Sequence, residues 1–389
     1  MPLTIDRLFE PFSFSEFHDV YYEKKPLLIK RQSPAFYDDL LTLEKINEHI
    51  GEDHLPSTAY RMVHDGNELD VKDFTYPNSS VNNRGEAATV DKDALFAKWY
   101  EGWSILIMQY ESPAVLRLRH ALERAFHGSA LARVFLTPRN AQGFTPHWDL
   151  DEGFVLQFAG TKDWVVYDSP ITLPGRRQHF YSKDWTRVEP TLTATLEPGD
   201  LLYMPRGFVH EAHARDTVSG HITITLRTTT YADLLWEIAN NADVDPWLRK
   251  SLPSDFQSVA SNDEFLRHVH RFFDNADLPA YIERLHSDFT DDLAPDAKDR
   301  LADYVKLPSV GADSRFHMRS VVNHELTNGG EHVVLTFHRK SLKFPAAAAE
   351  SIRCMIASGE FTVSTLPGNC DDNLALCRTL VQEGFLGIV

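Results

Sequence analysis

Short apolar runs separated by turn residues dominate the first 230 positions of the chain. Gly, Pro, Asn or Asp bounds each run, a pattern that predicts many short strands arranged as a sandwich or barrel. Pro113–Phe126 interrupts this pattern with apolar residues at helical spacing, which predicts a helix. The clearest predicted strands are Pro26–Lys30, Ser104–Met108, Gly153–Phe158, Trp164–Tyr167 and His221–Leu226.

Beyond residue 230 the apolar spacing becomes helical. Tyr231–Ala239 and Asp263–Phe273 are predicted helices, and apolar faces on a string of helices often pack against a second copy of the chain. We therefore expect homodimerisation through residues 231–302, with packing of these helices on their own barrel as the alternative.

The last part of the chain, from residue 303, mixes both patterns. His332–Phe337 predicts a strand, whereas Ala346–Ala357 and Asp371–Gln382 predict helices, and strand character returns after Gly384. A small helix-and-wing module over 303–389 would account for this order. The expected organisation is thus a strand-rich domain over 1–230, a helical region over 231–302 and this module.

Composition and charge exclude several classes of function. The chain has 389 residues and a net charge of −17, which disfavours nonspecific attraction to nucleic acid or anionic membranes. The excess is concentrated in residues 232–300, with 15 acidic against 7 basic residues. This region either attracts a basic partner or is a solvated helical surface. Helix-and-wing modules often bind DNA, but this one has no basic stripe, so we do not expect DNA binding.

The location of the chain is predicted from what its sequence does not contain. No apolar run approaches the roughly 20 residues of a membrane helix, and no signal peptide is evident at the start. The three cysteines are an odd, sparse set without a CxxC pair, which argues against disulfides and structural zinc. We expect a cytoplasmic protein.

His147-Trp148-Asp149 is the motif with the most chemical information. On a strand, residues i and i+2 face the same way, so His147 and Asp149 could bind one metal ion together. His210 follows a Pro-Gly-Asp turn, a buried strand over Leu201–Met204 and a Pro-Arg-Gly turn, so it could supply a third ligand. Two histidines and one carboxylate form the facial triad of non-haem Fe(II) oxygenases, which leaves metal positions open for other ligands.

Other histidines compete for the third position. His221 opens a strand and could line the pocket, His213 could serve behind the ligands, and His179 has the setting of a loop residue. We rank His210 first, His221 next and His213 last.

An oxygenase of this type needs an electron-donating cosubstrate. 2-Oxoglutarate would chelate the iron and needs a cation for its far carboxylate. Lys162, at the start of a strand after Gly160-Thr161, could provide it if a hairpin returned the chain beside the HxD strand. Thr223 could add a hydroxyl donor. The alternatives are a solvent-facing turn lysine and a structural threonine. Motifs for nucleotide binding or nucleophilic hydrolysis are missing.

These motifs resemble the JmjC ribosomal oxygenases of the cupin superfamily. The resemblance rests on Asn140–Asp149, Phe154–Gln157, Gly160–Trp164 and Glu197–Ala212, with Pro26–Arg31 similar to the opening strand. It implies a mainly β fold with added helices: a double-stranded β-helix or jelly roll, a helical dimerisation region and a C-terminal winged-helix-like domain.

The resemblance also implies the site. His147, Asp149 and His210 match the Fe(II) ligands, while Lys162 and Thr223 match the 2-oxoglutarate contacts. Family members use O₂ to hydroxylate His or Arg side chains of ribosomal proteins. Several relatives carry a Tyr that holds 2-oxoglutarate where this chain has Phe135, so one hydrogen bond to the cosubstrate is absent here.

We therefore predict an Fe(II)- and 2-oxoglutarate-dependent oxygenase that hydroxylates a side chain of a ribosomal or other basic protein. One alternative is a lysine or arginine demethylase with the same iron chemistry, which would release formaldehyde. Another is a non-catalytic cupin-like binding module. A cupin with a different metal, such as a small-molecule isomerase, is a further possibility because these ligands do not fix the metal.

Overall fold

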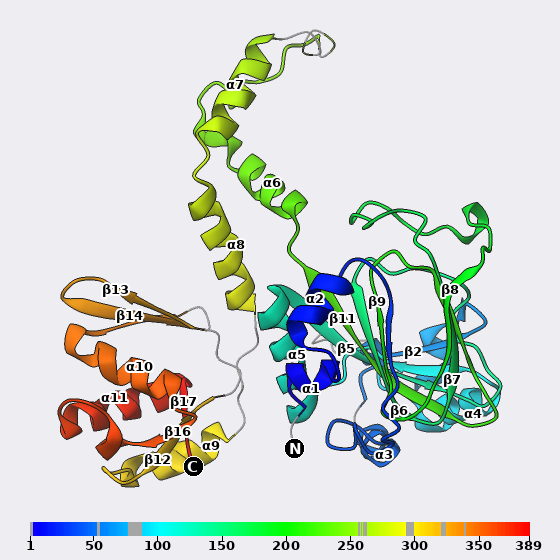
Figure 1. Cartoon of the computed structure of the whole chain (residues 1–389), viewed down its shortest axis with the longest axis horizontal. Helices are drawn as coiled ribbons and strands as arrows, with labels where there is room; N and C mark the ends of the chain where they lie inside the picture. The colour runs from blue at the N-terminus through cyan, green and yellow to red at the C-terminus, as the bar shows by residue number, and fades with distance from the viewer. Residues whose placement is uncertain are drawn as a thin grey trace. The chain divides into compact units, whose positions relative to one another are not determined.

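The structure is a computed structural model that describes residues 3–52, 55–76, 88–255, 257, 259, 263–292, 299–319, 324–337 and 340–389. The chain divides into two compact units, Met1–Thr228 and Thr229–Val389 (Figure 1). This division falls close to the predicted boundary near residue 230. The subdivision of the second unit at residue 302 stays a prediction.

Two antiparallel sheets form the framework of the first unit. The larger has the strand order β1-β9-β6-β11-β5-β4-β2-β3, and the smaller has the order β10-β7-β8. This is the mixed, strand-rich architecture that the sequence predicts. The elements are α1 (Ile5–Phe9), α2 (Phe14–Val20), β1 (Leu27–Ile29), α3 (Leu43–Gly51), β2 (Tyr60–His64), β3 (Asn67–Glu68), α4 (Lys92–Tyr100), β4 (Ser104–Ile107), α5 (Pro113–Phe126), β5 (Gly128–Thr137), β6 (Glu152–Ala159), β7 (Lys162–Tyr167), β8 (Pro190–Leu196), β9 (Leu201–Met204), β10 (His210–Ala214) and β11 (Ser219–Thr228).

The two faces of the large sheet pack against different parts of the first unit. Successive side chains of a strand point to opposite faces. On β6, Phe154 and Leu156 join the core beneath the helices, whereas Val155 joins a cluster with Trp164 of β7. α1, α2 and α5 lie on the helical side of this sheet (Figure 1). The opposite face therefore looks toward the small sheet.

α5 shows how local sequence sets an element. Ser112 caps its first turn by accepting a hydrogen bond from the Val115 amide, Pro113 occupies the first turn, and His127 ends the helix in the left-handed conformation at φ 48°. The predicted helix over Pro113–Phe126 is confirmed.

The hairpin predicted at Gly160-Thr161 is wrong. β6 and β7 belong to different sheets, so the turn transfers the chain from one sheet to the other. Gly160 has φ 58°, and a Cβ there would lie 1.7 Å from the Val218 carbonyl oxygen, so this close corner requires glycine. β7 pairs with β10 instead, with Val166 opposite His210.

The second unit contains helices and two three-stranded sheets, in the orders β16-β12-β17 and β13-β14-β15. Its core is apolar and includes Phe316, Leu335, Ile352 and Leu380. The elements are α6 (Tyr231–Asn240), α7 (Asp263–Asp274), α8 (Leu278–Asp292), α9 (Arg300–Lys306), β12 (Arg315–Met318), β13 (Glu325–Asn328), β14 (His332–Phe337), β15 (Lys340–Pro345), α10 (Ala349–Ala357), β16 (Glu360–Thr362), α11 (Cys370–Glu383) and β17 (Leu386–Ile388).

The predicted helices and strand of this unit are present, with small shifts at their ends. The predicted helix over Ala346–Ala357 begins with a 3₁₀ turn over Ala346–Ala348 before α10. α11 ends as expected at Gly384, whose φ is 87°. In the described part of the chain, no helix is both long and apolar enough to cross a membrane.

Candidate active site

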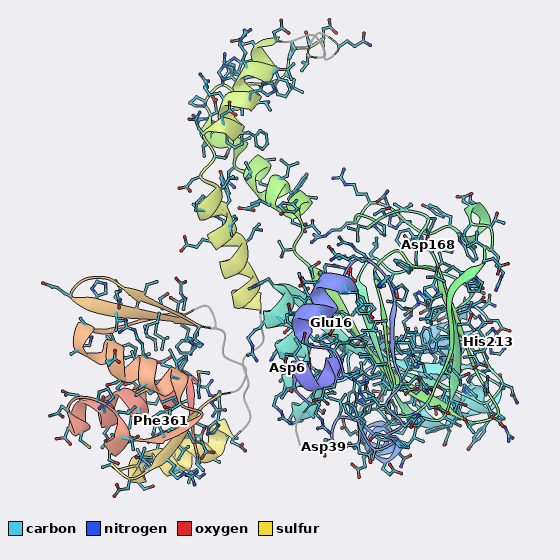
Figure 2. The ribbon with its side chains drawn as sticks, in the orientation of Figure 1. Asp6, Glu16, Asp39, Asp168, His213 and Phe361 are labelled. Atoms are coloured by element: carbon cyan, nitrogen blue, oxygen red, sulfur yellow. The ribbon has the colours of Figure 1, made fainter. Side chains whose placement is uncertain are left out.

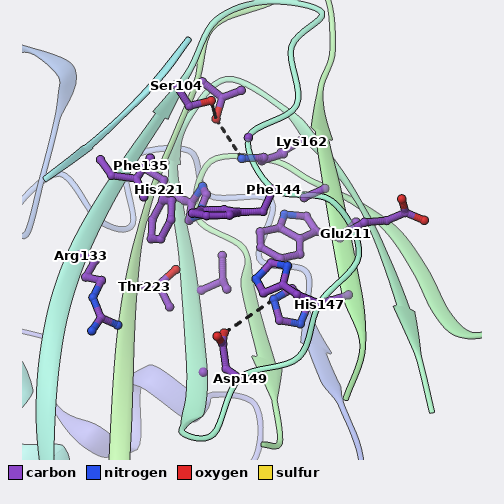
Figure 3. A pocket seen from close by; sticks show the side chains of 18 of the residues that line it. Ser104, Arg133, Phe135, Phe144, His147, Asp149, Lys162, Glu211, His221 and Thr223 are labelled. Atoms are coloured by element: carbon purple, nitrogen blue, oxygen red, sulfur yellow. Dashed lines mark hydrogen bonds and ion pairs between the residues drawn. The ribbon is translucent and has the colours of Figure 1, made fainter. Parts of the chain in front are cut away.

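Three predicted metal ligands meet at the edge of a pocket of about 330 Å³ between the two sheets. One ligand atom from each of His147, Asp149 and His210 lies within 4.8 Å of the other two. His210 Nε2 is 3.8 Å from Asp149 Oδ2, and the two imidazole centroids are 4.4 Å apart (Figure 3). His210 is buried, whereas the side chain of Asp149 is 51% exposed. A metal ion at this cluster could therefore be reached from solvent.

His147 and Asp149 do not lie on a regular strand, contrary to the prediction. They belong to the connection between β5 and β6, where Pro138 and Pro146 lack the N–H that a strand ladder needs. This connection runs beside β10 as an irregular edge. The His147 amide donates to the His210 carbonyl at 3.1 Å, and the His210 amide donates to the His147 carbonyl at 2.8 Å. Backbone bonds thus join the two histidines directly.

In both histidines, a hydrogen bond from Nδ1 to a backbone carbonyl orients the ring. His147 Nδ1 lies 2.8 Å from the Thr145 carbonyl and His210 Nδ1 lies 3.0 Å from the Phe208 carbonyl. Because a carbonyl only accepts, each Nδ1 is the donor in its hydrogen bond, which leaves each Nε2 as the nitrogen for a metal. Burial and the neighbouring His147 lower the pKa of His210 to about 4. The cluster therefore offers two imidazoles and one carboxylate as candidate metal ligands.

Lys162 lies in the same pocket with 5% of its surface exposed. Its Nζ donates to Thr137 Oγ1 at 3.0 Å, and Ser104 Oγ lies 3.4 Å from that same oxygen. Among the described residues it has no acidic partner, and burial lowers its pKa to about 7. The predicted cation is thus a buried amine held by a hydroxyl, and the solvent-facing alternative is wrong.

Two further polar groups near Lys162 have no hydrogen-bond partner in the described part of the chain. Trp164 Nε1 and His221 Nδ1 are buried without a hydrogen bond among the described residues. Their rings are 5.6 Å apart, and burial together with the Lys162 charge keeps the pKa of His221 well below its usual value. Buried polar atoms without partners mark places where a polar ligand could bind.

Phe135 and Thr223 also line this pocket. Phe135 stacks on His221 with ring centroids 4.7 Å apart, and its side chain has no hydroxyl to offer a ligand. Thr223 is 9% exposed and its hydroxyl makes no hydrogen bond to any other described residue. The structure thus brings all five predicted site residues into one pocket, whereas exposed His213 and His179 lie outside it. His213 is on the outer surface of the first unit (Figure 2).

Sequence reasoning did not identify Thr137, Ser104 or Arg133 as pocket residues. For Arg133 and Thr137, the sequence signal was the alternation of core-facing and pocket-facing residues along β5. Ala132, Val134 and Leu136 are buried in the core beneath the helices, so Arg133, Phe135 and Thr137 face the pocket.

Comparison with known proteins agrees with this geometry. Residues 106–234 match the JmjC domain family. The bifunctional lysine-specific demethylase and histidyl-hydroxylase NO66 of Aedes aegypti is 34% identical over 231 residues, which are 58% of this chain and 34% of that protein. Ribosomal oxygenase 1 of Homo sapiens is 28% identical over 444 aligned positions, covering 98% of this chain and 67% of that protein.

A solved structure has a similar fold. The structure of YcfD, a ribosomal oxygenase from Escherichia coli, in complex with cobalt and 2-oxoglutarate, matches with a TM-score of 0.53 and 16% identity, covering 97% of this chain and 98% of that one. The chain spans 34%, 37% and 43% of the length of three curated relatives. Over residues 106–234 the chain is therefore similar to the JmjC domain family, and over 97% of its length its fold is similar to that of YcfD.

Proposed function

We propose that this protein is an Fe(II)- and 2-oxoglutarate-dependent oxygenase that hydroxylates a side chain of a protein substrate. The observation that carries the proposal is the presence in one pocket of a two-histidine, one-carboxylate cluster and a buried lysine that has no acidic partner among the described residues. The two histidines and the carboxylate suit Fe(II), and the lysine suits the far carboxylate of 2-oxoglutarate.

The residues divide the work between holding the metal and holding the cosubstrate. His147, Asp149 and His210 would hold Fe(II) on one side and leave the other side open. A bound iron would couple O₂ activation to oxidative decarboxylation of 2-oxoglutarate. Lys162 and Thr223 would orient the cosubstrate, with Thr137 fixing the lysine in place. Burial of Lys162, at 5% exposure, would keep bulk water from the far carboxylate of the cosubstrate.

The relatives' names supply the proposed substrate. Ribosomal oxygenase 1 and the histidyl-hydroxylase NO66 suggest a ribosomal protein modified at a histidine, and arginine is the second candidate residue. The NO66 name also includes lysine-specific demethylase. The two activities differ in product, because hydroxylation adds one oxygen to the substrate whereas demethylation releases formaldehyde.

Anaerobic titration with Fe(II) and 2-oxoglutarate tests the proposal. We expect the weak visible charge-transfer band of the chelate in the wild-type protein and its loss in His210→Ala. His213→Ala is the matched control, because His213 is exposed on the same strand as His210 and should leave the band intact. A folded, iron-supplied protein that gives no band would rule out this function and favour a different metal or a non-catalytic module.

We also propose homodimerisation through the helical region over 231–302. Support comes from large apolar side chains exposed on α6 and α8, including Leu235 at 56%, Trp236 at 61% and Ile282 at 55%. Light scattering should show a dimer that Leu235→Asp combined with Ile282→Asp converts to a monomer. A wild-type monomer at micromolar concentration would contradict the proposal.

A winged-helix-like domain over 303–389 and a cytoplasmic location remain proposals. The order of α10, β16, α11 and β17 over one apolar core is compatible with the former. Three cysteines without disulfides, Cys354, Cys370 and Cys377, are compatible with the latter. Fluorescent tagging of the full chain would test the location, and DNA-binding assays should be negative.

A further inference from the structure

Arg133 is a charged pocket residue to which neither the metal nor the cosubstrate gives a role. It lies on β5, opposite Thr223 of β11, and faces the pocket together with Phe135. Its Nη1 donates to Thr225 Oγ1 at 3.2 Å, and its Nε is buried without an acceptor. Among the described residues it has no carboxylate partner. A half-buried guanidinium bound only to one hydroxyl still has most of its donors available.

The direction of the Arg133 side chain separates it from the Lys162 end of the pocket. Thr137, which holds Lys162, lies four residues further along β5, or about 13 Å at the usual strand rise. Thr225 is opposite Leu131, so the bond from Arg133 to Thr225 directs the guanidinium away from Thr137. Figure 3 shows Arg133 and Lys162 in separate parts of the pocket. A cosubstrate held by Lys162 and the metal cluster therefore leaves Arg133 free for another ligand.

The other charges that line the pocket are already balanced. Arg61 pairs with Glu68, with Nε and Oε1 2.6 Å apart, and Glu211 is ion-paired with Arg187. In the loaded site, Asp149 and one carboxylate of 2-oxoglutarate offset the two charges of Fe(II). Lys162 offsets the remaining carboxylate. Arg133 is then the one uncompensated charge among the described pocket residues.

We propose that Arg133 is a specificity-determining residue that binds the carboxylate of an Asp or Glu close to the modified residue in the substrate; this rests on the proposed function. The guanidinium presents parallel N–H donors that match both oxygens of a carboxylate. A main-chain carbonyl of the substrate would accept from only some of these N–H donors and would leave the charge of Arg133 uncompensated. The substrate segment is thus one in which an acidic side chain accompanies the target residue.

A degenerate heptapeptide library, captured without O₂ on the full chain loaded with Fe(II) and 2-oxoglutarate, tests this assignment. Sequencing of the retained peptides should show Asp and Glu enriched about tenfold at one position, as expected for a charge-assisted pair. Arg133→Met should lose this enrichment. Arg133→Glu should replace it with enrichment of Lys and Arg at that same position, which a merely structural role for Arg133 would not produce.

Arg61→Met is the matched control. Arg61 is an arginine of the same pocket that already has an acidic partner, so this variant should retain the acidic enrichment. The visible band of the iron chelate, recorded on each sample, tests the proposed function separately. A band without acidic enrichment in the wild type, or with equal enrichment in Arg133→Met, would overturn the role of Arg133 alone. Loss of the band itself would instead overturn the proposed function.

Discussion

Lys162 of the first unit and Arg319 of the second are both buried cations, at 5% and 3% exposure, but their surroundings differ. Arg319 is ion-paired with Asp303 and donates from Nε to the Leu386 carbonyl at 3.1 Å. Lys162 has one threonine hydroxyl and no acid among the described residues. A buried charge with a partner connects parts of a fold, whereas a buried charge without one weakens the fold and suits a ligand.

The metal ligands should show the largest functional effect and little structural effect. His147→Ala, Asp149→Ala or His210→Ala should each lower turnover about 1,000-fold or more, because the metal site loses one of three ligands. Succinate formation measures turnover, and circular dichroism should show an unchanged fold. Near-normal activity in any of the three variants would refute that ligand's assignment.

Arg319→Met should have the opposite pattern. It leaves the Asp303 carboxylate buried without its cation, which should cost about 3–5 kcal/mol in the free energy of unfolding of the second unit. Urea denaturation measures this loss, while binding of 2-oxoglutarate should not change. The double variant with Asp303→Leu should recover most of the stability. If it does not, the pair is not what makes the single variant unstable.

Lys162→Met should weaken 2-oxoglutarate binding about 100-fold, through loss of a charge-assisted bond to a buried carboxylate. The metal-free protein should gain stability, with a melting temperature at pH 6 higher by about 3 °C. The pKa of Lys162 in the folded protein, about 7, lies below the ordinary lysine value of 10.5, so the unfolded chain binds more protons between these two pH values. Lys162 therefore destabilises the fold most below pH 7, and this destabilisation decreases as the pH rises from 7 to 10.5. An unchanged affinity would exclude the cosubstrate role.

The pH dependence of cosubstrate affinity is the smallest expected effect. Below about pH 7 Lys162 is already protonated in the free pocket, and affinity for 2-oxoglutarate should be constant. Above it, binding must also supply a proton, so the dissociation constant should rise up to about tenfold per pH unit. Isothermal titration of the Mn(II)-loaded protein measures this slope. Lys162→Met should have a flatter profile, and an identical slope in both proteins would assign the titration to another group.

The ends of elements and the identity of the metal cluster could be read from local sequence. Ser112, Pro113 and Gly384 mark helix limits by their own backbone chemistry, so α5 and the end of α11 were predictable. The spacing of His147 and Asp149 and the turns before His210 pointed to one cluster. Each of these signals lies within a short run of consecutive residues, although the runs around His147 and His210 are far apart in the sequence.

Features that depend on the packing of distant segments were not predictable in this way. The hairpin expected at Gly160 fails because Val218, 58 residues later, forms the corner. The absence of an acid near Lys162 depends on which strands surround it, and the pocket-facing position of Arg133 depends on which face of β5 the helices cover. No local sequence pattern indicates how these distant segments pack together.

The reciprocal backbone bonds between His147 and His210 have a consequence for the metal-free protein. Because peptide groups and not the metal join the two segments, the binding site is assembled before any ion arrives. Loading then requires no loop to close and little ordering of the chain. The metal-free protein would thus keep its two ligand histidines side by side, and an ion would add to a site whose backbone is already in place.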